Sequence, residues 1–220
     1  MNKRIFVSIL NADFRFLADQ IAAAADGGAD GVHVDIMDGH FVPNLSLGPQ
    51  VVSAVRACTG LTVDVHLMIE RPEHMINAFV EAGADSITIH QEATPHARLV
   101  IDQIHRLGAR AGLALNPGTA LSQATELLQD IETLLLMTVN PGFGGQALIP
   151  STIEKVQRAR SWLDETQSAA ALQVDGGVKL ENIASLSHAG ADVFIAGTSV
   201  FKVNTDPAER LRALRQQLFT

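Results

Sequence analysis

The chain has 220 residues, of which 47% are hydrophobic, and its mean hydropathy of +0.17 is sufficient for a large buried core. The formal net charge of -8 argues against nucleic acid or an anionic membrane as the main partner. An anionic ligand would therefore have to be held by backbone N–H groups, helix N-termini or a metal ion. Cys58 is the single cysteine, which excludes an internal disulfide and is typical of a reducing compartment.

The N-terminal stretch, residues 1–8, lacks the apolar run of a secretory signal and leads directly into an expected strand. No apolar run approaches the length of a transmembrane helix. We therefore expect a soluble cytoplasmic protein.

Eight strands are predicted along the chain, and most are continuous apolar runs. Such runs are typical of parallel strands that are buried on both faces. Amphipathic helices are predicted between them, for example at 16–25, 48–58 and 153–162, and Cys58 is expected to be an inert buried thiol in the second of these. Prolines stand near three expected helix starts, at Pro72, Pro95 and Pro150. The strands are expected at 5–10, 31–37, 61–68, 86–91, 110–115, 133–139, 170–175 and 193–197.

A short motif recurs between the expected helices and strands. Its four copies are Gly28-Ala-Asp30, Gly83-Ala-Asp85, Gly108-Ala-Arg110 and Gly190-Ala-Asp192. Their spacings of 55, 25 and 82 residues are close to two, one and three units of about 27, which is one eighth of the chain. The glycine suits the left-handed end of a helix. We predict eight strand–helix units that close into one (β/α)8 barrel over 1–220. A doubly wound open sheet is the alternative, but its Gly-x-Gly-x-x-Gly opening is absent.

Four polar residues stand at or near the ends of predicted strands. His33 and Asp35 are two apart on one strand, so their side chains leave on the same face. His66 and Asp175 close two other strands. In a barrel these ends meet at the face that carries the active site. A lone histidine there would be read as a core residue bonded to backbone, but two imidazoles and two carboxylates together favour one divalent ion, Zn, Fe, Mn or Co rather than Ca.

Residues of two further kinds stand near the same strand ends. Leu10, Met37, Met68 and Met137 are expected to form an apolar wall of the pocket. Small residues follow the last three strands, at 140–145, 175–177 and 196–199. Glycine lets backbone N–H groups approach a ligand closely, and the loops after the last strands of such barrels often bind phosphate. We therefore predict a phosphate site there.

A search for other catalytic chemistry is mostly negative. None of the four lysines is expected in the middle of a strand, where a Schiff base would form, and no Gly-x-Ser-x-Gly is present. His90 is expected at a strand end without an identified partner. The other histidines are expected to be solvated or locally bonded; they are His40, His74, His96, His105 and His188.

Several segments resemble the ribulose-phosphate 3-epimerase family. They are residues 8–14, 33–44, 64–68, 137–145 and 174–177, and the resemblance runs in register from about residue 5 to 201. The blocks at 33–44 and 137–145 are the most specific. Asn11 and Thr198 stand where this family often has serine, and Lys202 stands where a smaller residue is expected. The first two changes remove no key group, whereas Lys202 makes the match to the family less clear at the substrate-binding end.

The resemblance implies a TIM barrel of the ribulose-phosphate-binding type with a metal ion held by His33, Asp35, His66 and Asp175. It implies that Asp35 and Asp175 are the acid–base pair and that Ser8 and His66 contact the substrate. The phosphate of the substrate would rest on Gly142, Phe143, Gly144, Gly145, Gly176, Gly177, Gly197 and Thr198.

The implied reaction interconverts D-ribulose 5-phosphate and D-xylulose 5-phosphate through a metal-stabilised enediolate, as in the pentose phosphate pathway. Inversion at carbon 3 needs one group to remove a proton from one face and another to deliver a proton to the opposite face, which two carboxyl groups can do. The sequence does not say which aspartate holds the proton at rest. Apolar helices and the resemblance favour a homo-oligomer, either a dimer or a hexamer.

Three alternatives stay open. A related epimerase acts on a six-carbon ketose phosphate such as D-allulose 6-phosphate, but it tends to break the glycine pairs at 144–145 and 176–177, which are intact here. A decarboxylase on the same barrel would need an Asp-x-Lys strand motif, and the block around Asp35 has no lysine. The third alternative is a barrel that binds metal or sugar phosphate without turnover.

Overall fold

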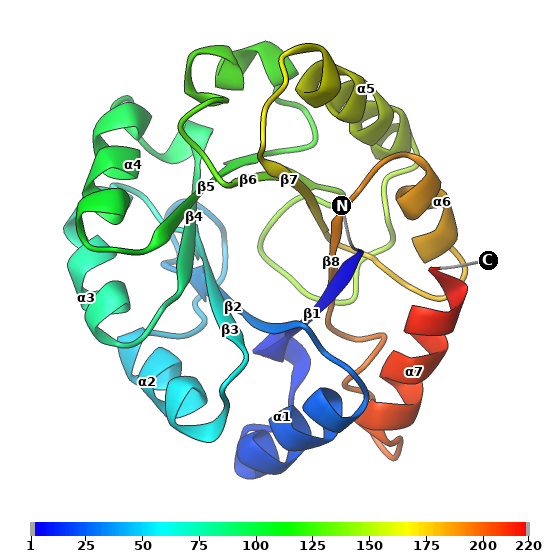
Figure 1. Cartoon of the computed structure of the whole chain (residues 1–220). Coiled ribbons are helices and arrows are strands. Elements are labelled where there is room, and N and C mark those ends of the chain that lie inside the picture. The colour runs from blue at the N-terminus through cyan, green and yellow to red at the C-terminus, as the bar shows by residue number, and fades with distance from the viewer. Residues whose placement is uncertain (1–2, 219–220) are drawn as a thin grey trace.

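The computed structural model describes residues 3–218; the first two and last two residues of the chain lie outside the described part. Within it, eight parallel strands close into a barrel in chain order, with β1 paired to both β2 and β8 (Figure 1). The predicted barrel is thus confirmed, and the open sheet is excluded because the first and last strands pair. The strands are β1 Arg4–Ser8, β2 Gly31–Met37, β3 Thr62–Met68, β4 Ser86–His90, β5 Arg110–Leu115, β6 Thr133–Met137, β7 Ala171–Asp175 and β8 Val193–Ala196.

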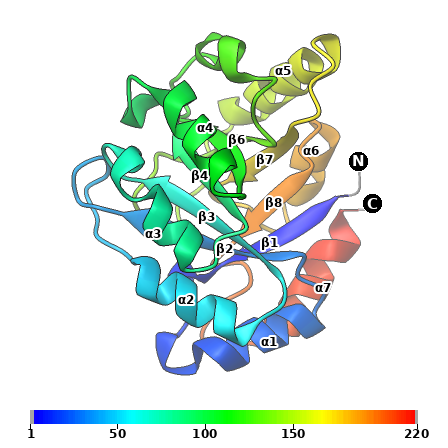
Figure 2. The ribbon, with the colours of Figure 1, turned by 60° about the vertical axis from the view of Figure 1, so that its left-hand side comes forward.

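Helices form an outer layer around the strands (Figures 1 and 2). The connection from β5 to β6 differs from the others, because a 3-10 helix, η5 (Leu121–Leu127), stands where the repeat predicts an α-helix. The α-helices are α1 Leu17–Asp26, α2 Pro49–Cys58, α3 Ile76–Glu81, α4 Ala97–Arg106, α5 Ser151–Glu165, α6 Ile183–His188 and α7 Pro207–Gln217. Shorter 3-10 turns are η1 Ile9–Asn11, η2 Phe14–Phe16, η3 Pro72–His74 and η4 Gln91–Ala93.

The predicted strands all occur, and two of them end two residues earlier than expected. The first ends at Ser8, whose hydroxyl accepts the N–H of Leu10 and so starts η1. The sixth ends at Met137 rather than at residue 139. In both places the chain turns into a loop that lines the cavity described below.

The recurring Gly-Ala-Asp motif has a structural role at the amino ends of the strands. Its glycines follow α1, α3, α4 and α6 with φ between +85° and +105°, as expected for left-handed helix ends. The carboxylates accept backbone N–H groups from an adjacent strand: Asp30 from Ile5, Asp85 from Val63 and Asp192 from Leu172. The repeat therefore joins neighbouring strands at the amino ends of the barrel strands.

The main apolar core lies between the barrel and its helices. On β2, Val32, Val34 and Ile36 pack into this core together with residues of α1 and α2. The alternate residues of β2 point into the barrel, where Met37 contacts Met68. Alternation along β2 therefore separates a structural face from a polar, inward face that carries His33 and Asp35.

The expectation of a buried thiol is wrong, because Cys58 is exposed. Val52 and Val55 supply the buried side of α2, and the helix ends at Cys58, past this packed face and two residues before the exposed Gly60. No helix within residues 3–218 combines the length and apolar character needed to span a bilayer.

Candidate active site

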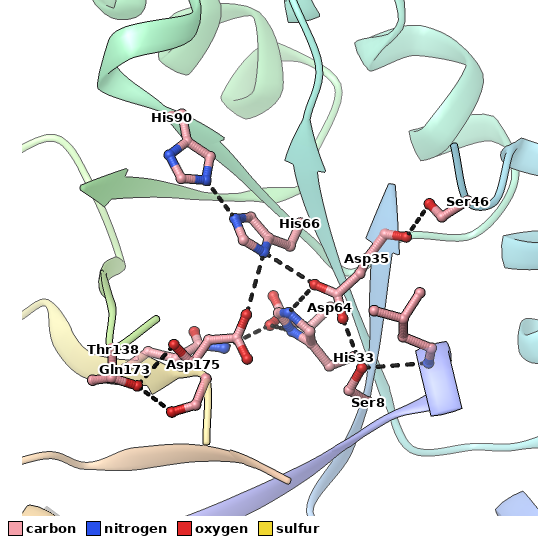
Figure 3. A network of polar contacts seen from close by, with 12 residues as sticks. Ser8, His33, Asp35, Ser46, Asp64, His66, His90, Thr138, Gln173 and Asp175 are labelled. Carbon is pink, nitrogen blue, oxygen red and sulfur yellow. Dashed lines mark hydrogen bonds and ion pairs between the residues drawn. The ribbon is translucent and has the colours of Figure 1, made fainter. Parts of the chain in front are cut away.

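The strand register brings the four predicted polar residues together at the carboxyl ends of the strands. Asp35 of β2 pairs with His66 of β3, and Asp175 closes β7 beside Met137. One potential ligand atom from each of His33, Asp35, His66 and Asp175 lies within 4.8 Å of the corresponding atoms of the others. Figure 3 shows these side chains converging from three strands. We call these four residues the polar cluster.

Asp35 is the centre of the polar cluster. Its Oδ1 lies 3.2 Å from His66 Nδ1 and 3.3 Å from His33 Nε2, and its Oδ2 accepts a 2.6 Å hydrogen bond from the Ser8 hydroxyl. The second carboxylate lies slightly farther away, with Asp175 Oδ2 at 3.7 Å from His66 Nδ1. Both imidazoles are fully buried, whereas the Asp175 side chain is 14% exposed.

A buried nitrogen without a hydrogen-bond partner indicates that the polar cluster fits a divalent ion. His33 Nε2 is buried and has no hydrogen-bond partner among the described residues. The other ring nitrogen, Nδ1, lies 2.8 Å from Asp64 Oδ2 and is oriented to donate to it. His33 therefore directs a nitrogen without a hydrogen bond into the cluster, and this nitrogen can ligate a metal ion once the ring has lost its proton. Two imidazole nitrogens with two carboxylates form a donor set suited to Zn, Fe, Mn or Co.

A group of buried residues holds His33 through its Nδ1, on the side of the ring away from the cluster. Asp64 of β3 is 2% exposed and also accepts hydrogen bonds from Ser86 and from Gln173 Nε2, the latter at 2.9 Å. Such a carboxylate behind a histidine ligand fixes which nitrogen faces the metal. The sequence reasoning missed Asp64, although strand alternation puts it on the same face as His66.

A second group of residues holds His66. His66 Nε2 lies 2.9 Å from His90 Nε2, and His90 Nδ1 lies 3.3 Å from Glu92 Oε2. His90 is therefore not partnerless, and the sequence missed its role because the contact depends on the packing of β3 against β4. The remaining histidines outside the cluster are exposed, in agreement with their expected solvation.

The two carboxyl groups of the polar cluster have opposite proton affinities. Burial alone would raise the pKa of Asp35, but His33 and His66 outweigh it and hold that pKa well below its ordinary value. For Asp175, burial and the nearby Asp35 charge both raise the pKa, to about 7. Without a metal, the proton shared by this pair therefore resides on Asp175.

The imidazoles also differ. Burial alone would lower the pKa of His33, but the Asp35 and Asp64 carboxylates raise it well above its ordinary value. The pKa of His66 is lowered, mainly by burial. Burial lowers the pKa of His90 to about 4, so this ring is neutral at pH 7.

A cavity opens directly above the polar cluster. Asp35, Asp175 and Ser8 line its base, and the predicted wall residues Leu10, Met37, Met68 and Met137 all line its side. His66 does not line it, because its ring lies behind the two carboxylates. The predicted phosphate-binding residues that line the cavity are Gly142, Phe143, Gly144, Gly145, Gly176, Gly177, Gly197 and Thr198. We call these eight residues the glycine rim.

Close backbone approach explains two of the glycines. Gly176 has φ +116°, and a Cβ there would lie 2.4 Å from a methyl carbon of Val139. A Cβ on Gly144 would meet the side-chain amide of Asn11. Asn11 also lines the cavity and was not predicted to do so. Asn44 donates a 2.7 Å hydrogen bond to Gly142 O, which joins the two sequence blocks most specific to the resembled family.

Fold and site together define a (β/α)8-barrel enzyme whose ionisable groups gather at the carboxyl ends of its strands. The sequence pattern of the ribulose-phosphate 3 epimerase family matches residues 4–201. The chain belongs to this family and is therefore an epimerase.

Named relatives agree with this assignment. The chain is 46% identical over 202 residues to ribulose-phosphate 3-epimerase 1 of Cupriavidus necator, a match that covers 90% of this chain and 84% of the relative. It is 45% identical over 199 residues to the ribulose-phosphate 3-epimerase of Bacillus subtilis, covering 90% and 92%.

Solved structures share the fold at low identity. A crystal structure of 3-hexulose-6-phosphate synthase superposes with TM-score 0.73 at 18% identity and covers 98% of this chain and 99% of that one. A 3-keto-L-gulonate-6-phosphate decarboxylase from Vibrio cholerae superposes with TM-score 0.73 at 14% identity, covering 100% and 98%. At this identity the likeness extends to the barrel only.

Proposed function

We propose that the protein interconverts D-ribulose 5-phosphate and D-xylulose 5-phosphate by inverting carbon 3. The names of its relatives support the substrate. The observation that carries the proposal is the position of two carboxyl groups, Asp35 from β2 and Asp175 from β7, at the base of one cavity. An inverting proton transfer needs two such groups, because the proton leaves one face of carbon 3 and returns to the other.

The proton transfers follow from the two carboxyl environments. The proton on carbon 3 is acidic because the neighbouring ketone can take up negative charge as an enediolate. The ionised carboxylate of the pair removes this proton, and the protonated carboxyl donates its own to the opposite face. In the reverse reaction the two aspartates exchange roles. Ser8 donates to Asp35 Oδ2 and so orients that carboxylate at 2.6 Å.

A divalent ion held by His33, Asp35, His66 and Asp175 would supply Lewis-acid stabilisation of the negative charge that develops on the substrate oxygens. The protein itself contributes two oriented imidazole nitrogens and a cavity wall of methionine and leucine that limits water. The substrate reaches the cluster from the side of the carboxylates, since the imidazoles lie behind them.

The glycine rim would hold the phosphate end of the substrate. Exposed lysine or arginine is not needed for this, because closely spaced backbone N–H groups bind phosphate well. The side-chain-free positions at Gly144 and Gly176 keep the rim open, and Thr198 adds a hydroxyl. An overall negative protein can in this way accept an anionic sugar phosphate.

The test is a coupled assay on ribulose 5-phosphate and, separately, on allulose 6-phosphate, with the metal content of the purified protein measured in parallel. We expect turnover of the five-carbon substrate at least about tenfold faster in kcat/KM, which corresponds to about 1.4 kcal/mol of discrimination. Faster turnover of allulose 6-phosphate would instead assign to the protein the activity of the related six-carbon epimerase. Binding of either sugar phosphate without turnover would leave only a binding barrel.

We also infer a homo-oligomer, dimer or hexamer, from the family membership. Light scattering on the full chain tests this, and a monomer at micromolar concentration would contradict it. Cytoplasmic location stays a prediction.

A further inference from the structure

A short relay of hydrogen bonds leads from the polar cluster to the barrel rim and is not used by the proposed reaction. His66 Nε2 contacts His90 Nε2 at 2.9 Å, and His90 Nδ1 contacts Glu92 Oε2 at 3.3 Å. Figure 3 shows His90 on the side of His66 that faces away from Asp35 and Asp175. The question is what this relay does to His66.

Proton counting constrains the contact between the two imidazoles. Two ring nitrogens at 2.9 Å need one proton between them, because two lone pairs or two N–H groups would repel. His90 is fully buried, with its ring 5.0 Å from that of His66 and 4.8 Å from that of Phe41, so a cationic ring would be costly there. The neutral His90 therefore has one N–H, and its position decides the position of the proton on His66.

Glu92 decides where that N–H lies. Its Oε1 accepts the backbone N–H of Asn116 at 2.8 Å and the hydroxyl of Thr119. These donors favour the ionised carboxylate, which can only accept hydrogen bonds. His90 must therefore carry its proton on Nδ1 and donate it to Glu92.

The remaining protons follow in order. His90 Nε2 is then an acceptor, so His66 must carry its proton on Nε2 and donate it to His90. This leaves an unshared pair on His66 Nδ1, which lies 3.2 Å from Asp35 and 3.7 Å from Asp175. A divalent ion bound between these atoms would relieve the repulsion of the unshared pair by the Asp35 carboxylate. We propose that Glu92, acting through His90, is a positioning residue that fixes His66 in the tautomer offering Nδ1 to a divalent ion.

The proposal depends on the metal site of the proposed function but not on its substrate. His33 is oriented by a shorter route, because Asp64 directly accepts from Nδ1 and leaves Nε2 as the nitrogen that faces the cluster. The two ligands therefore present opposite nitrogens, each set by a carboxylate on its far side. For His66 that carboxylate lies two hydrogen bonds away, on η4.

The test is Glu92→Gln, which is close in size but reverses the relay. The glutamine oxygen would keep the bonds from Asn116 and Thr119, so its NH2 would face His90 Nδ1 as a donor. His90 would then donate from Nε2, and His66 would carry its proton on Nδ1. Nitrogen-15 NMR of the metal-free protein should show the His66 Nδ1 signal move from the unprotonated to the protonated range.

Metal affinity gives the second readout. Competition with a chelator should show that Glu92→Gln binds Co²⁺ or Zn²⁺ with a dissociation constant about 10–100-fold higher than that of the wild type. The matched control is Glu132→Gln, because Glu132 also pairs with a histidine, His105, at 3.1 Å and accepts a backbone N–H, yet both side chains are exposed. This control and the His33 signals should not change.

The proposal is overturned if His66 Nδ1 is protonated in the metal-free wild type, or if Glu92→Gln changes neither the tautomer nor the affinity. His90→Phe serves as a second variant if Glu92→Gln does not fold: it removes the acceptor for His66 Nε2, so the His66 signals should show a mixture of tautomers and metal binding should weaken. A single unchanged tautomer in that variant would also overturn the proposal. A shifted tautomer in a protein that fails to turn over ribulose 5-phosphate would refute the proposed function alone.

Discussion

The polar cluster and the glycine rim occupy adjacent parts of one cavity and are built in opposite ways. In the polar cluster, three of the four side chains have a buried partner that fixes their direction: Asp64 for His33, His90 for His66 and Ser8 for Asp35. In the glycine rim, the important feature is the absence of a side chain at Gly144 and Gly176, since a Cβ at either position would overlap a neighbour. One part depends on charge and the position of protons, and the other depends on space.

This difference predicts which substitutions are harmful in each part. In the polar cluster, a change that preserves shape and removes charge should be severe. In the glycine rim, a change that adds one carbon and no charge should be severe. The predictions below test this contrast, beginning with the largest expected effect.

Asp175→Asn and Asp35→Asn should each lower kcat by about 10⁴-fold, because an amide can neither accept nor deliver the proton of carbon 3. The fold should survive, since the shape of the side chain is kept. Steady-state kinetics with circular dichroism checks both points. Asp164→Asn, an exposed position on α5, is the control. Retained turnover in either purified cluster variant would refute the two-carboxyl assignment.

Metal removal should have the next largest effect. Dialysis against a chelator should lower activity by about 10³-fold, which corresponds to the loss of several kcal/mol of transition-state stabilisation. Zn²⁺, Fe²⁺, Mn²⁺ or Co²⁺ should restore activity and Ca²⁺ should not, because nitrogen ligands suit the former. Full activity in protein shown by elemental analysis to be metal-free would contradict the assignment of the cluster.

Gly176→Ala should mainly affect substrate binding. Its φ of +116° and the 2.4 Å approach to Val139 force the backbone to move, at a cost of about 1–3 kcal/mol in the free energy of unfolding. We expect KM to rise by about 100-fold, as for a lost hydrogen bond to a charged group. Gly118→Ala is the matched control, since nothing lies within 4 Å of a Cβ there. A normal KM in a folded Gly176→Ala variant would show that the loop around Gly176 does not bind the substrate phosphate.

Asp64→Asn should weaken metal binding by about tenfold. This is at the lower end of the range for residues that hydrogen-bond to a metal-ligating histidine, because the amide oxygen can still accept from His33 Nδ1. Asp130→Asn, a partly exposed carboxylate paired with Arg98, is the control. Equal metal affinity in Asp64→Asn and wild type, measured by chelator competition, would show that Asp64 serves the fold alone.

The contrast also explains how far the sequence could lead. The barrel and its eight strands follow from the apolar runs and the Gly-Ala-Asp spacing, and alternation on β2 puts His33 and Asp35 on one face. The same rule would have found Asp64, two residues before His66. Glu92 could not be found this way, because η4 turns the chain at the end of β4 and brings Glu92 back to His90.

Long-range packing limits the other predictions. Asn11 lies against Gly144 and Gly197, which are distant in sequence and meet only once the barrel has closed. The position of the shared proton also depends on packing, since it requires the distances between Asp35, Asp175 and the imidazoles. The exposed Cys58 and the 3-10 helix η5 are local departures from the repeat that no periodic pattern contains.

The smallest expected effect is a pH dependence of stability that originates at Glu92. Burial opposes the charge of this residue, but His90, Thr119 and Asn116 outweigh burial and lower its pKa from 4.5 to about 2. The folded-state pKa is depressed, so this stabilisation is complete above pH 4.5 and is lost as the pH falls toward 2. We expect Glu92→Gln to cost about 1 kcal/mol of unfolding free energy near pH 7, allowing for partial exposure, and nothing near pH 2. Urea unfolding of the metal-free proteins measures both values, and a difference that does not change with pH would mean that the Glu92 charge contributes nothing to stability.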